Sequence, residues 1–240
     1  MQSEDRSADA RWARAGGAAS LLLVVVLVAA LAFRAAASDV TDTVGDPQGY
    51  LGDLVDNRDE AAVSVWLMGA ASLLLAVVFT GLYFGLRRWG EDAMRVALAA
   101  GLTAAVLNVG RVAAQAAIVA HIVPEWAVDP NPLRRAVLQA NFGTIEWFSI
   151  ATESALQVSL SVAMTAAGLV MMRMGRRWWW PALVGFAGAI AGLVGAFRPA
   201  EAGLRDATLL QVAALALWLL LLSVRLQLTG EEGEGESGVD

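Results

Sequence analysis

Six long runs of apolar residues constrain this chain more than any other feature of its sequence. The first, from Ala15 to Phe33, contains no charged residue, and comparable runs recur along the chain. A helix of about 20 apolar residues is long enough to cross a hydrocarbon core of about 30 Å. Only 17% of the residues are charged, against about 25% in an average soluble domain. The sequence therefore predicts an all-α integral membrane protein.

We expect a membrane domain over residues 15–228, a six-helix bundle with short loops. The predicted spans cover about residues 15–37, 61–86, 93–123, 147–172, 181–198 and 206–226. Residues 1–14 precede the bundle as a cytoplasmic segment. Residues 229–240 are mostly Gly, Glu and Ser, and we expect them to form a disordered acidic tail.

Three prolines interrupt the helical pattern in the middle of the chain. Pro124, Pro130 and Pro132 remove backbone donors, so we expect the third span to end at Val123. Asn131 and Pro132 have the pattern of a cap for the next helix. That helical stretch, from Leu133 to Met172, exceeds one simple crossing, and its first dozen residues are expected at the outer interface.

The positions of the arginines predict how the chain is oriented in the membrane. Arginines lie in the N-terminal segment and then at every second connection: Arg87 and Arg88; Arg173, Arg176 and Arg177; Arg225. Positive residues favour the cytoplasmic side, so both termini are expected in the cytoplasm of a multi-pass plasma-membrane protein. Arg34, Arg134 and Arg135 run against this bias. A cleaved signal peptide is the alternative for the first span, although the apolar run is longer than the usual 7–15 residues.

Residues 38–60 are acidic and form the predicted outer loop. Within it, Asp46 and Pro47 have the pattern of a helix N-cap followed by a first-turn proline. Tyr50, Leu51, Leu54 and Val55 then fall on one side at helical spacing. This pattern predicts a short amphipathic helix lying on the membrane surface. The carboxylates do not match the spacing of a calcium-binding loop.

Residue types exclude several classes of chemistry. The chain has no cysteine, a single histidine and no lysine, which removes thiolate sites, paired-histidine haem ligation and Schiff bases. Neither phosphate-binding nor nucleophile motifs are present. We therefore expect no catalytic residue, no metal and no cofactor. The lipid bilayer is the expected partner, and nucleic acid is not.

Polar residues on two predicted spans form the clearest candidate site. Those of the third span, at spacings of three and four, share one face, and those of the fourth stay close to one line. The candidate residues are Asn108, Arg111, Gln115, Glu146, Ser149, Glu153 and Gln157. Because polar groups inside a membrane are costly, such residues are functional hypotheses by default. We call this set the polar seam.

Helix rise suggests how the polar seam is matched. Counting about 1.5 Å per residue from Arg95 and Arg173 places Gln115 level with Glu153 and Arg111 level with Gln157. Glu146 then falls in the outer headgroup zone. An Arg111–Glu153 pair, offset by one turn, is a hypothesis.

Three functions remain open for the polar seam. It is either a closed hydrogen-bonded network that holds the bundle together or a small central site. Alternatively, Arg111 and Glu153 serve a solute or ion transporter or a proton-coupled channel. An intramembrane enzyme acting on lipid is a third alternative, but no nucleophile with a positioned base is visible.

Glycines mark one face of the fifth span. Gly185, Gly188, Gly192 and Gly195 follow a spacing of three, four and three, which allows close helix packing. The partner of this face is either another helix of the same chain or a second copy in a homo-oligomer. Gly81 and Gly85 form a further pair of small residues near the end of the second span.

Residues 108–118, Asn-Val-Gly-Arg-Val-Ala-Ala-Gln-Ala-Ala-Ile, carry a family resemblance. This string resembles a stretch of the bacterial membrane family known as domain of unknown function 4386. The layout of apolar spans is similar to that family as well, whereas the polar fourth span is not matched. The resemblance implies a class of membrane protein and no particular reaction.

Overall fold

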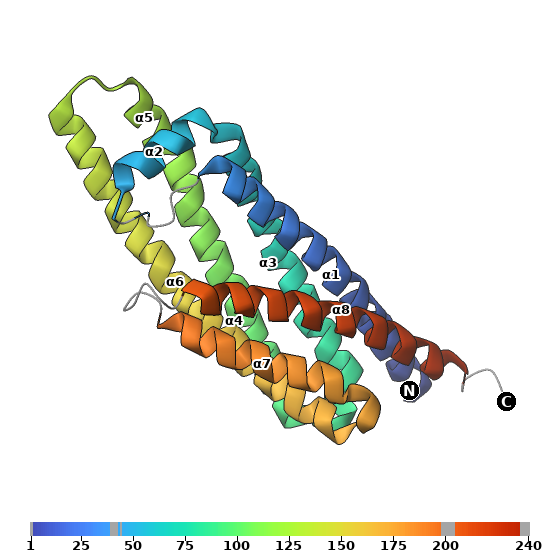
Figure 1. The fold of residues 1–240 in the computed structure, drawn as a ribbon. Coiled ribbons are helices and arrows are strands. Elements are labelled where there is room, and N and C mark those ends of the chain that lie inside the picture. Colours follow the sequence, from blue (N-terminus) through green and yellow to red (C-terminus); the bar gives the residue numbers. More distant parts are fainter. Residues whose placement is uncertain (1, 39–42, 44, 198–204, 236–240) are drawn as a thin grey trace. The chain divides into compact units, whose positions relative to one another are not determined.

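The computed structural model describes residues 2–38, 43, 45–197 and 205–235, and its side chains over 7–38, 43, 45–197 and 210–227. Every regular element in these ranges is a helix (Figure 1). In chain order they are α1 Gln2–Ala37, α2 Pro47–Asp56, α3 Arg58–Leu86, η1 Arg87–Trp89, α4 Glu91–Ala117, η2 Ile118–Ile122, α5 Val123–Val128, α6 Pro132–Arg173, η3 Arg176–Trp178, α7 Trp179–Ala196 and α8 Arg205–Gly235.

Six helical stretches are long and apolar enough to cross a membrane. They begin at Ser7, Arg58, Glu91, Pro132, Arg176 and Leu210. The predicted helical architecture with six long apolar helices is thereby confirmed for the described part of the chain. Residues 39–42 of the predicted outer loop, residues 198–204 and residues 236–240 of the predicted tail lie outside the described residues.

The chain divides into two compact units. Unit 1 comprises Met1–Val24, Leu73–Val106 and Ser154–Asp240, and unit 2 comprises Val25–Ser72 and Leu107–Glu153. The helices α1, α3, α4 and α6 contribute residues to both. Six of the seven residues of the polar seam belong to unit 2, so unit 2 positions the candidate site.

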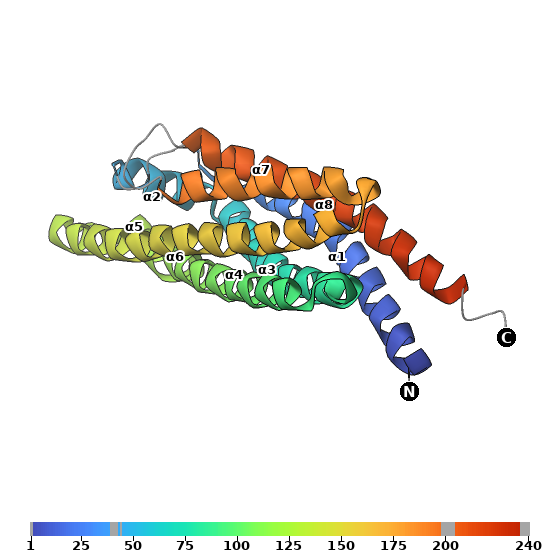
Figure 2. The ribbon, with the colours of Figure 1, turned by 90° about the horizontal axis from the view of Figure 1, so that it is seen from below.

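Small residues set the packing of unit 1. The helices α7 and α8 run side by side (Figure 2), and all four glycines of the α7 face are buried. A Cβ added at Gly188 would lie 2.7 Å from Met164 and 3.2 Å from Ala214, and one at Gly185 would lie 2.9 Å from Trp218. Residues of α6 and α8 thus cover this face within the chain, and a homo-oligomer stays a prediction.

The helix α2 belongs to the core of unit 2. Its N-cap is the predicted Asp46, whose Oδ1 accepts from the Gly49 N–H at 2.9 Å, with Pro47 in the first turn. Its apolar face is buried in a cluster with residues of α1, α3, η2, α5 and α6: Ala37, Tyr50, Leu51, Leu54, Ala61, Ile118, Val119, Ile122, Val123, Leu138 and Phe142. The prediction of the helix and of its apolar face is confirmed. The protein itself covers that face, and the expected place of α2 on the membrane surface stays a prediction.

The third span continues further than predicted. A turn of π-helix, Ile118–Ile122, follows α4, and α5 then carries the chain from Val123 to Val128. Pro124 stands in the first turn of α5, directly after the π-helical turn. The proline therefore starts a new helical segment here and does not end the span at Val123.

The boundaries of two later helices also differ from expectation. Pro132–Arg173 is one helix, and the Asn131 side chain accepts from the Leu133 N–H at 2.9 Å, which confirms the predicted cap. The last helix, α8, continues to Gly235, beyond the predicted end at residue 226. Residues 231, 232 and 234 are glutamates, which are good helix formers, so helix continues into the predicted tail.

Candidate functional site

Asn108 and Arg111 begin the polar seam on α4. The Asn108 amide donates to Ser72 Oγ at 2.9 Å and to the Met68 carbonyl at 3.2 Å, so α3 and α4 are joined by a buried side-chain contact. Its Oδ1 accepts from Arg111 Nε at 3.3 Å. Asn108 is therefore fully engaged, and its role is to hold the Arg111 side chain in position.

Gln115 and Glu146 form the second part of the polar seam. Gln115 Nε2 donates to Glu146 Oε2 at 2.9 Å and to Ser149 Oγ at 3.2 Å. The other oxygen of Glu146 accepts from Thr43 Oγ1 at 2.8 Å. Both carboxylate oxygens thus have donors, and Glu146 is buried. These hydrogen bonds join α4, α6 and the loop before α2.

Counting the rise per residue along each helix gave the wrong register between α4 and α6. That count placed Gln115 level with Glu153, and it placed Glu146 in the outer headgroup zone. In the structure Gln115 bonds to Glu146 and Ser149, about two and one turns away from Glu153 along α6. Side-chain packing and helix tilt set the register between two helices, and the rise of each helix alone does not determine them.

Arg111 and Glu153 form the predicted pair, but the contact is long. Arg111 Nη1 lies 3.6 Å from Glu153 Oε2, and Nη2 lies 3.6 Å from the sulfur of Met68. An N–H···O hydrogen bond is normally about 2.7–3.2 Å long. A guanidinium has five N–H donors, so the distances leave Arg111 donors available to a further partner. Its side chain retains 12% exposure.

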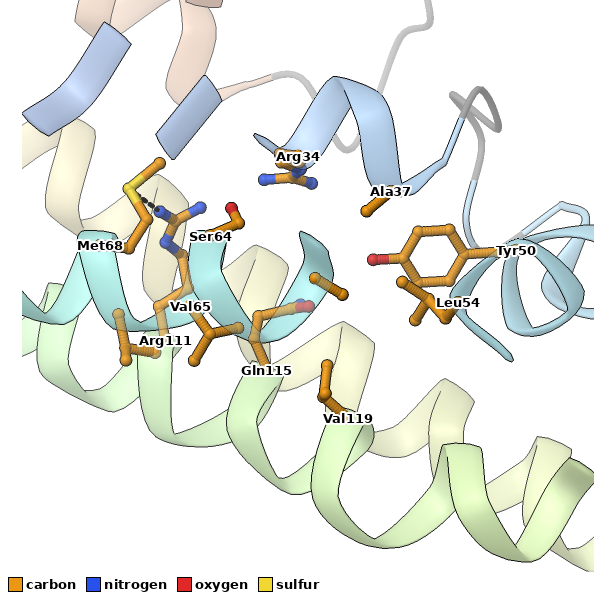
Figure 3. Close-up of a pocket in the computed structure, with 12 residues that line it drawn as sticks. Arg34, Ala37, Tyr50, Leu54, Ser64, Val65, Met68, Arg111, Gln115 and Val119 are labelled. Carbon is orange, nitrogen blue, oxygen red and sulfur yellow. Dashed lines mark hydrogen bonds between the residues drawn. The ribbon is translucent and has the colours of Figure 1, made fainter. Parts of the chain in front are cut away.

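A cavity in unit 2 opens beside Arg111. It occupies about 510 Å³ including its open mouth, and its walls come from α1, α2, α3 and α4. Figure 3 shows the side chains of Arg34, Arg111 and Tyr50 directed toward the same space, together with the Ser64 hydroxyl and the Gln115 amide. The rest of the lining is apolar: Ala37, Leu54, Ala61, Val65, Met68, Val112 and Val119.

Tyr50 contributes a neutral phenol to this cavity. Burial raises the pKa of the Tyr50 hydroxyl above its usual value of 10.0, while Arg34 lowers that pKa and Glu146 raises it. Burial is the largest of these effects. The phenol therefore stays protonated at neutral pH and can donate a hydrogen bond into the cavity.

Arg34 was not among the predicted site residues, although it carried a signal. It was one of three arginines that ran against the charge bias. The structure accounts for the other two: Arg134 pairs with Asp129 at 2.9 Å, and Arg135 donates to the Asp129 carbonyl at 2.7 Å. Among the described residues no carboxylate pairs with Arg34, which lines the cavity. An arginine on the unexpected side can thus indicate a site.

Ser72 and Thr43, partners of Asn108 and Glu146, were missed as well. Ser72 lies in an apolar run and Thr43 in the acidic loop, and nothing in the local sequence distinguishes them. Gln157, which was predicted to belong to the polar seam, lies in unit 1 and is buried there. The structure brings the other six seam residues together in unit 2.

The polar groups that line the cavity of unit 2 are two guanidinium groups, a phenol, a hydroxyl and an amide, and no carboxylate is among the described residues of its lining. Within the described ranges no group of three histidine, aspartate or glutamate residues could hold a metal ion. Nor does any model of a protein family, curated protein or solved structure match this chain, so the resemblance of residues 108–118 to the family of unknown function 4386 remains a prediction.

Proposed function

We propose that this chain is a multi-pass plasma-membrane protein with six spans, both termini in the cytoplasm and a small central binding site in unit 2. Six long apolar helices support membrane insertion. Many large apolar side chains on these helices are exposed on the surface of the protein, among them Val106 at 70% and Leu73 at 71% exposure. Soluble monomers rarely leave large contiguous apolar areas exposed.

The orientation can be tested with single cysteines, because the natural chain has none. Asp56→Cys and Arg88→Cys place an exposed thiol in the predicted outer loop and in the predicted cytoplasmic turn. A membrane-impermeant maleimide should label Asp56→Cys in intact cells and Arg88→Cys only after the membrane is permeabilised. The reverse pattern would contradict the proposed orientation, and labelling of both in intact cells would contradict the intervening span.

The long Arg111–Glu153 contact carries the proposal of a binding site. A closed structural network would be expected to enclose a guanidinium with short hydrogen bonds, because burying an unsatisfied charge is costly. Arg111 instead has its one described carboxylate contact, to Glu153, at 3.6 Å, and its other described contacts are to the neutral Asn108 Oδ1 and the sulfur of Met68, beside an open cavity. This geometry supports a site that is completed by a bound polar ligand.

A thermal-shift screen of the purified full-length chain tests this binding role. Ions, amines and amphiphiles would be compared on the natural chain, Arg111→Gln and Arg95→Gln, the last being an exposed arginine paired with Glu91 in unit 1. At least one compound should raise the melting temperature of the natural chain and of Arg95→Gln but not of Arg111→Gln. If no compound produced such a pattern, a structural polar seam would be the better description.

Transport through the same site is a second candidate, supported by the loose ion pair. Glu153 retains 25% side-chain exposure beside Arg111, as a carboxylate that exchanges partners would require. If the site transports its ligand, Glu153→Gln should leave the melting temperature nearly unchanged and abolish flux in proteoliposomes. Retained flux in Glu153→Gln would contradict a role of this carboxylate in transport.

A further inference from the structure

We propose that the cavity of unit 2 binds an anionic amphiphile, a carboxylate or phosphate attached to an apolar chain, between Arg34 and Arg111. This inference rests on the proposed binding role and specifies its ligand. Three observations carry it: the charge of the lining, the engagement of the nearby carboxylates, and the apolar character of the remaining wall.

The charge of the lining selects an anion. Arg34 and Arg111 approach the cavity from α1 and α4 and face the same space (Figure 3), and none of the described residues that line it is a carboxylate. Two like charges beside one cavity repel each other unless a counter-charge is present. A carboxylate or phosphate placed between the two guanidinium groups would supply that charge and could accept paired N–H donors.

The two neighbouring carboxylates are already engaged. Glu146 accepts from Thr43 and Gln115, at 2.8 and 2.9 Å. Glu153 lies on the other side of Arg111 and makes one contact with it at 3.6 Å. Neither forms an ion pair with Arg34, which has no ion-pair partner among the described residues. The described residues of the lining therefore carry two positive charges and no negative charge.

Neutral donors and acceptors add to the anion site. The Tyr50 phenol points toward the cavity and is kept protonated by burial. The Ser64 hydroxyl donates to the Ala30 carbonyl at 3.0 Å, so toward the cavity it presents acceptor lone pairs. A second oxygen of the anion can thus accept a hydrogen bond from the Tyr50 hydroxyl. A hydroxyl of a ligand headgroup can donate a hydrogen bond to Ser64 Oγ.

The apolar wall selects an amphiphile over a free ion. Seven of the twelve lining residues are apolar and come from α1 to α4 and η2, and the mouth is open. A free inorganic anion would fill only the arginine end and leave the apolar wall without contacts.

Direct binding of laurate to the full-length chain tests this inference. The chain would be placed in nanodiscs of phosphatidylcholine alone, with empty nanodiscs measuring partition into lipid. Radiolabelled laurate should bind saturably, and dodecyl phosphate should compete with it. Dodecanol and dodecyltrimethylammonium have the same apolar chain with no charge or a positive charge, and neither should compete. Acetate and inorganic phosphate should compete only at much higher concentration.

Arg34→Gln is the decisive variant. It removes a charge from an exposed side chain that has no described ion-pair partner, so the fold and the melting temperature should be unchanged. Laurate affinity should fall about tenfold or more, the value of one hydrogen bond to a charged group. Arg88→Gln, an exposed arginine of unit 1, is the matched control and should bind laurate normally.

The outcomes separate the two proposals. Competition by dodecanol or by the quaternary ammonium, lost in Arg111→Gln, would overturn the anion assignment while leaving a binding site in unit 2. Acetate or phosphate that competed as well as laurate would overturn the amphiphile. Unchanged laurate affinity in Arg34→Gln would overturn the role of that arginine. If none of the probes bound saturably, both the anionic ligand and the proposed binding role would be contradicted.

Discussion

Units 1 and 2 bury polar side chains in different ways. In unit 2 the buried Asn108, Glu146 and Ser149 are each joined to neighbouring side chains by hydrogen bonds. In unit 1, Gln157 Oε1, Gln211 Nε2 and Trp218 Nε1 are buried without a hydrogen-bond partner among the described residues. Unit 1 is instead distinguished by glycines in close contact with neighbouring helices.

This difference teaches that buried polar residues in one chain can have separate origins. Those of unit 2 include charged groups that require partners, and the partners come from α3, α4, α6 and the loop before α2. Those of unit 1 that lack a described partner are uncharged amides and an indole. A sequence lists both kinds as polar positions in apolar helices, and only their surroundings separate them.

The largest expected effect comes from breaking the close packing of unit 1. The helices α1 and α3 approach at Gly16 and Gly81, and a Cβ at Gly81 would lie 2.8 Å from the Trp12 carbonyl oxygen. Because this neighbour is backbone, it cannot rotate away. Gly81→Ala should lower the free energy of unfolding by about 1–3 kcal/mol, and Gly81→Leu by more. Unfolding by SDS in mixed micelles measures both.

Gly143→Ala is the control, because a Cβ at that helical glycine meets nothing within 4 Å. It should be neutral or should stabilise the protein by about 0.5–1 kcal/mol. Equal effects of Gly81→Ala and Gly143→Ala would show that close packing does not distinguish unit 1.

The next effect comes from breaking the network of unit 2. Glu146→Ala leaves the Gln115 amide and the Thr43 hydroxyl without their acceptor. Unsatisfied buried groups cost about 1–3 kcal/mol, so the free energy of unfolding should fall by that amount. Glu91→Ala removes an exposed carboxylate paired with Arg95 and should cost less than about 1 kcal/mol. A smaller effect for Glu146→Ala would mean that the network does not stabilise unit 2.

Alkaline pH should affect unit 2 through Tyr50. Because burial raises the Tyr50 pKa above 10.0, folding favours the protonated phenol. Its contribution to stability is complete below pH 10 and is lost as the pH rises through the raised pKa of the folded state. The melting temperature should therefore fall above pH 10, and less so in Tyr50→Phe. Tyr83→Phe, the other tyrosine, is the control; an identical fall in Tyr50→Phe and the natural chain would refute this origin.

The smallest expected effect sharpens the contrast. Gln157→Met replaces a buried amide whose Oε1 has no described partner, so the free energy of unfolding should change by less than about 0.5 kcal/mol or should rise. Asn108→Met in unit 2 breaks bonds to Ser72 and Met68 and should cost about 1–3 kcal/mol. If the two substitutions had equal cost, the amides of the two units would not differ as described. SDS unfolding of both variants decides this.

Much of the fold could be predicted because it depends on local features. Apolar runs long enough to cross a membrane predicted the six long helices, and Asp46 and Asn131 were identified as helix caps from their place before prolines. The local sequence was less informative where the same residue is compatible with two backbone structures. Pro124 can end a helix or start one, and the π-helical turn before it decided in favour of a new helical segment.

The candidate site could be predicted only in part. Polar residues at helical spacing identified Arg111, Gln115 and Glu153, since their periodicity is a property of one helix. Their partners depend on the register of one helix against another, which explains why the Gln115–Glu146 bond was missed. Arg34 stood out only as an exception to a charge bias, because the direction of its side chain follows from the packing of α1.

The sequence by itself determined that this chain is helical, that six of its helices are long and apolar, and that charge is absent from most of their length. Length, composition and periodicity decide these properties residue by residue. Only the tertiary structure decided that Arg34 and Arg111 face one cavity while Gln157 lies in unit 1, and that α2 covers the core of unit 2. Those facts depend on which faces pack together, and packing joins residues that are distant along the chain.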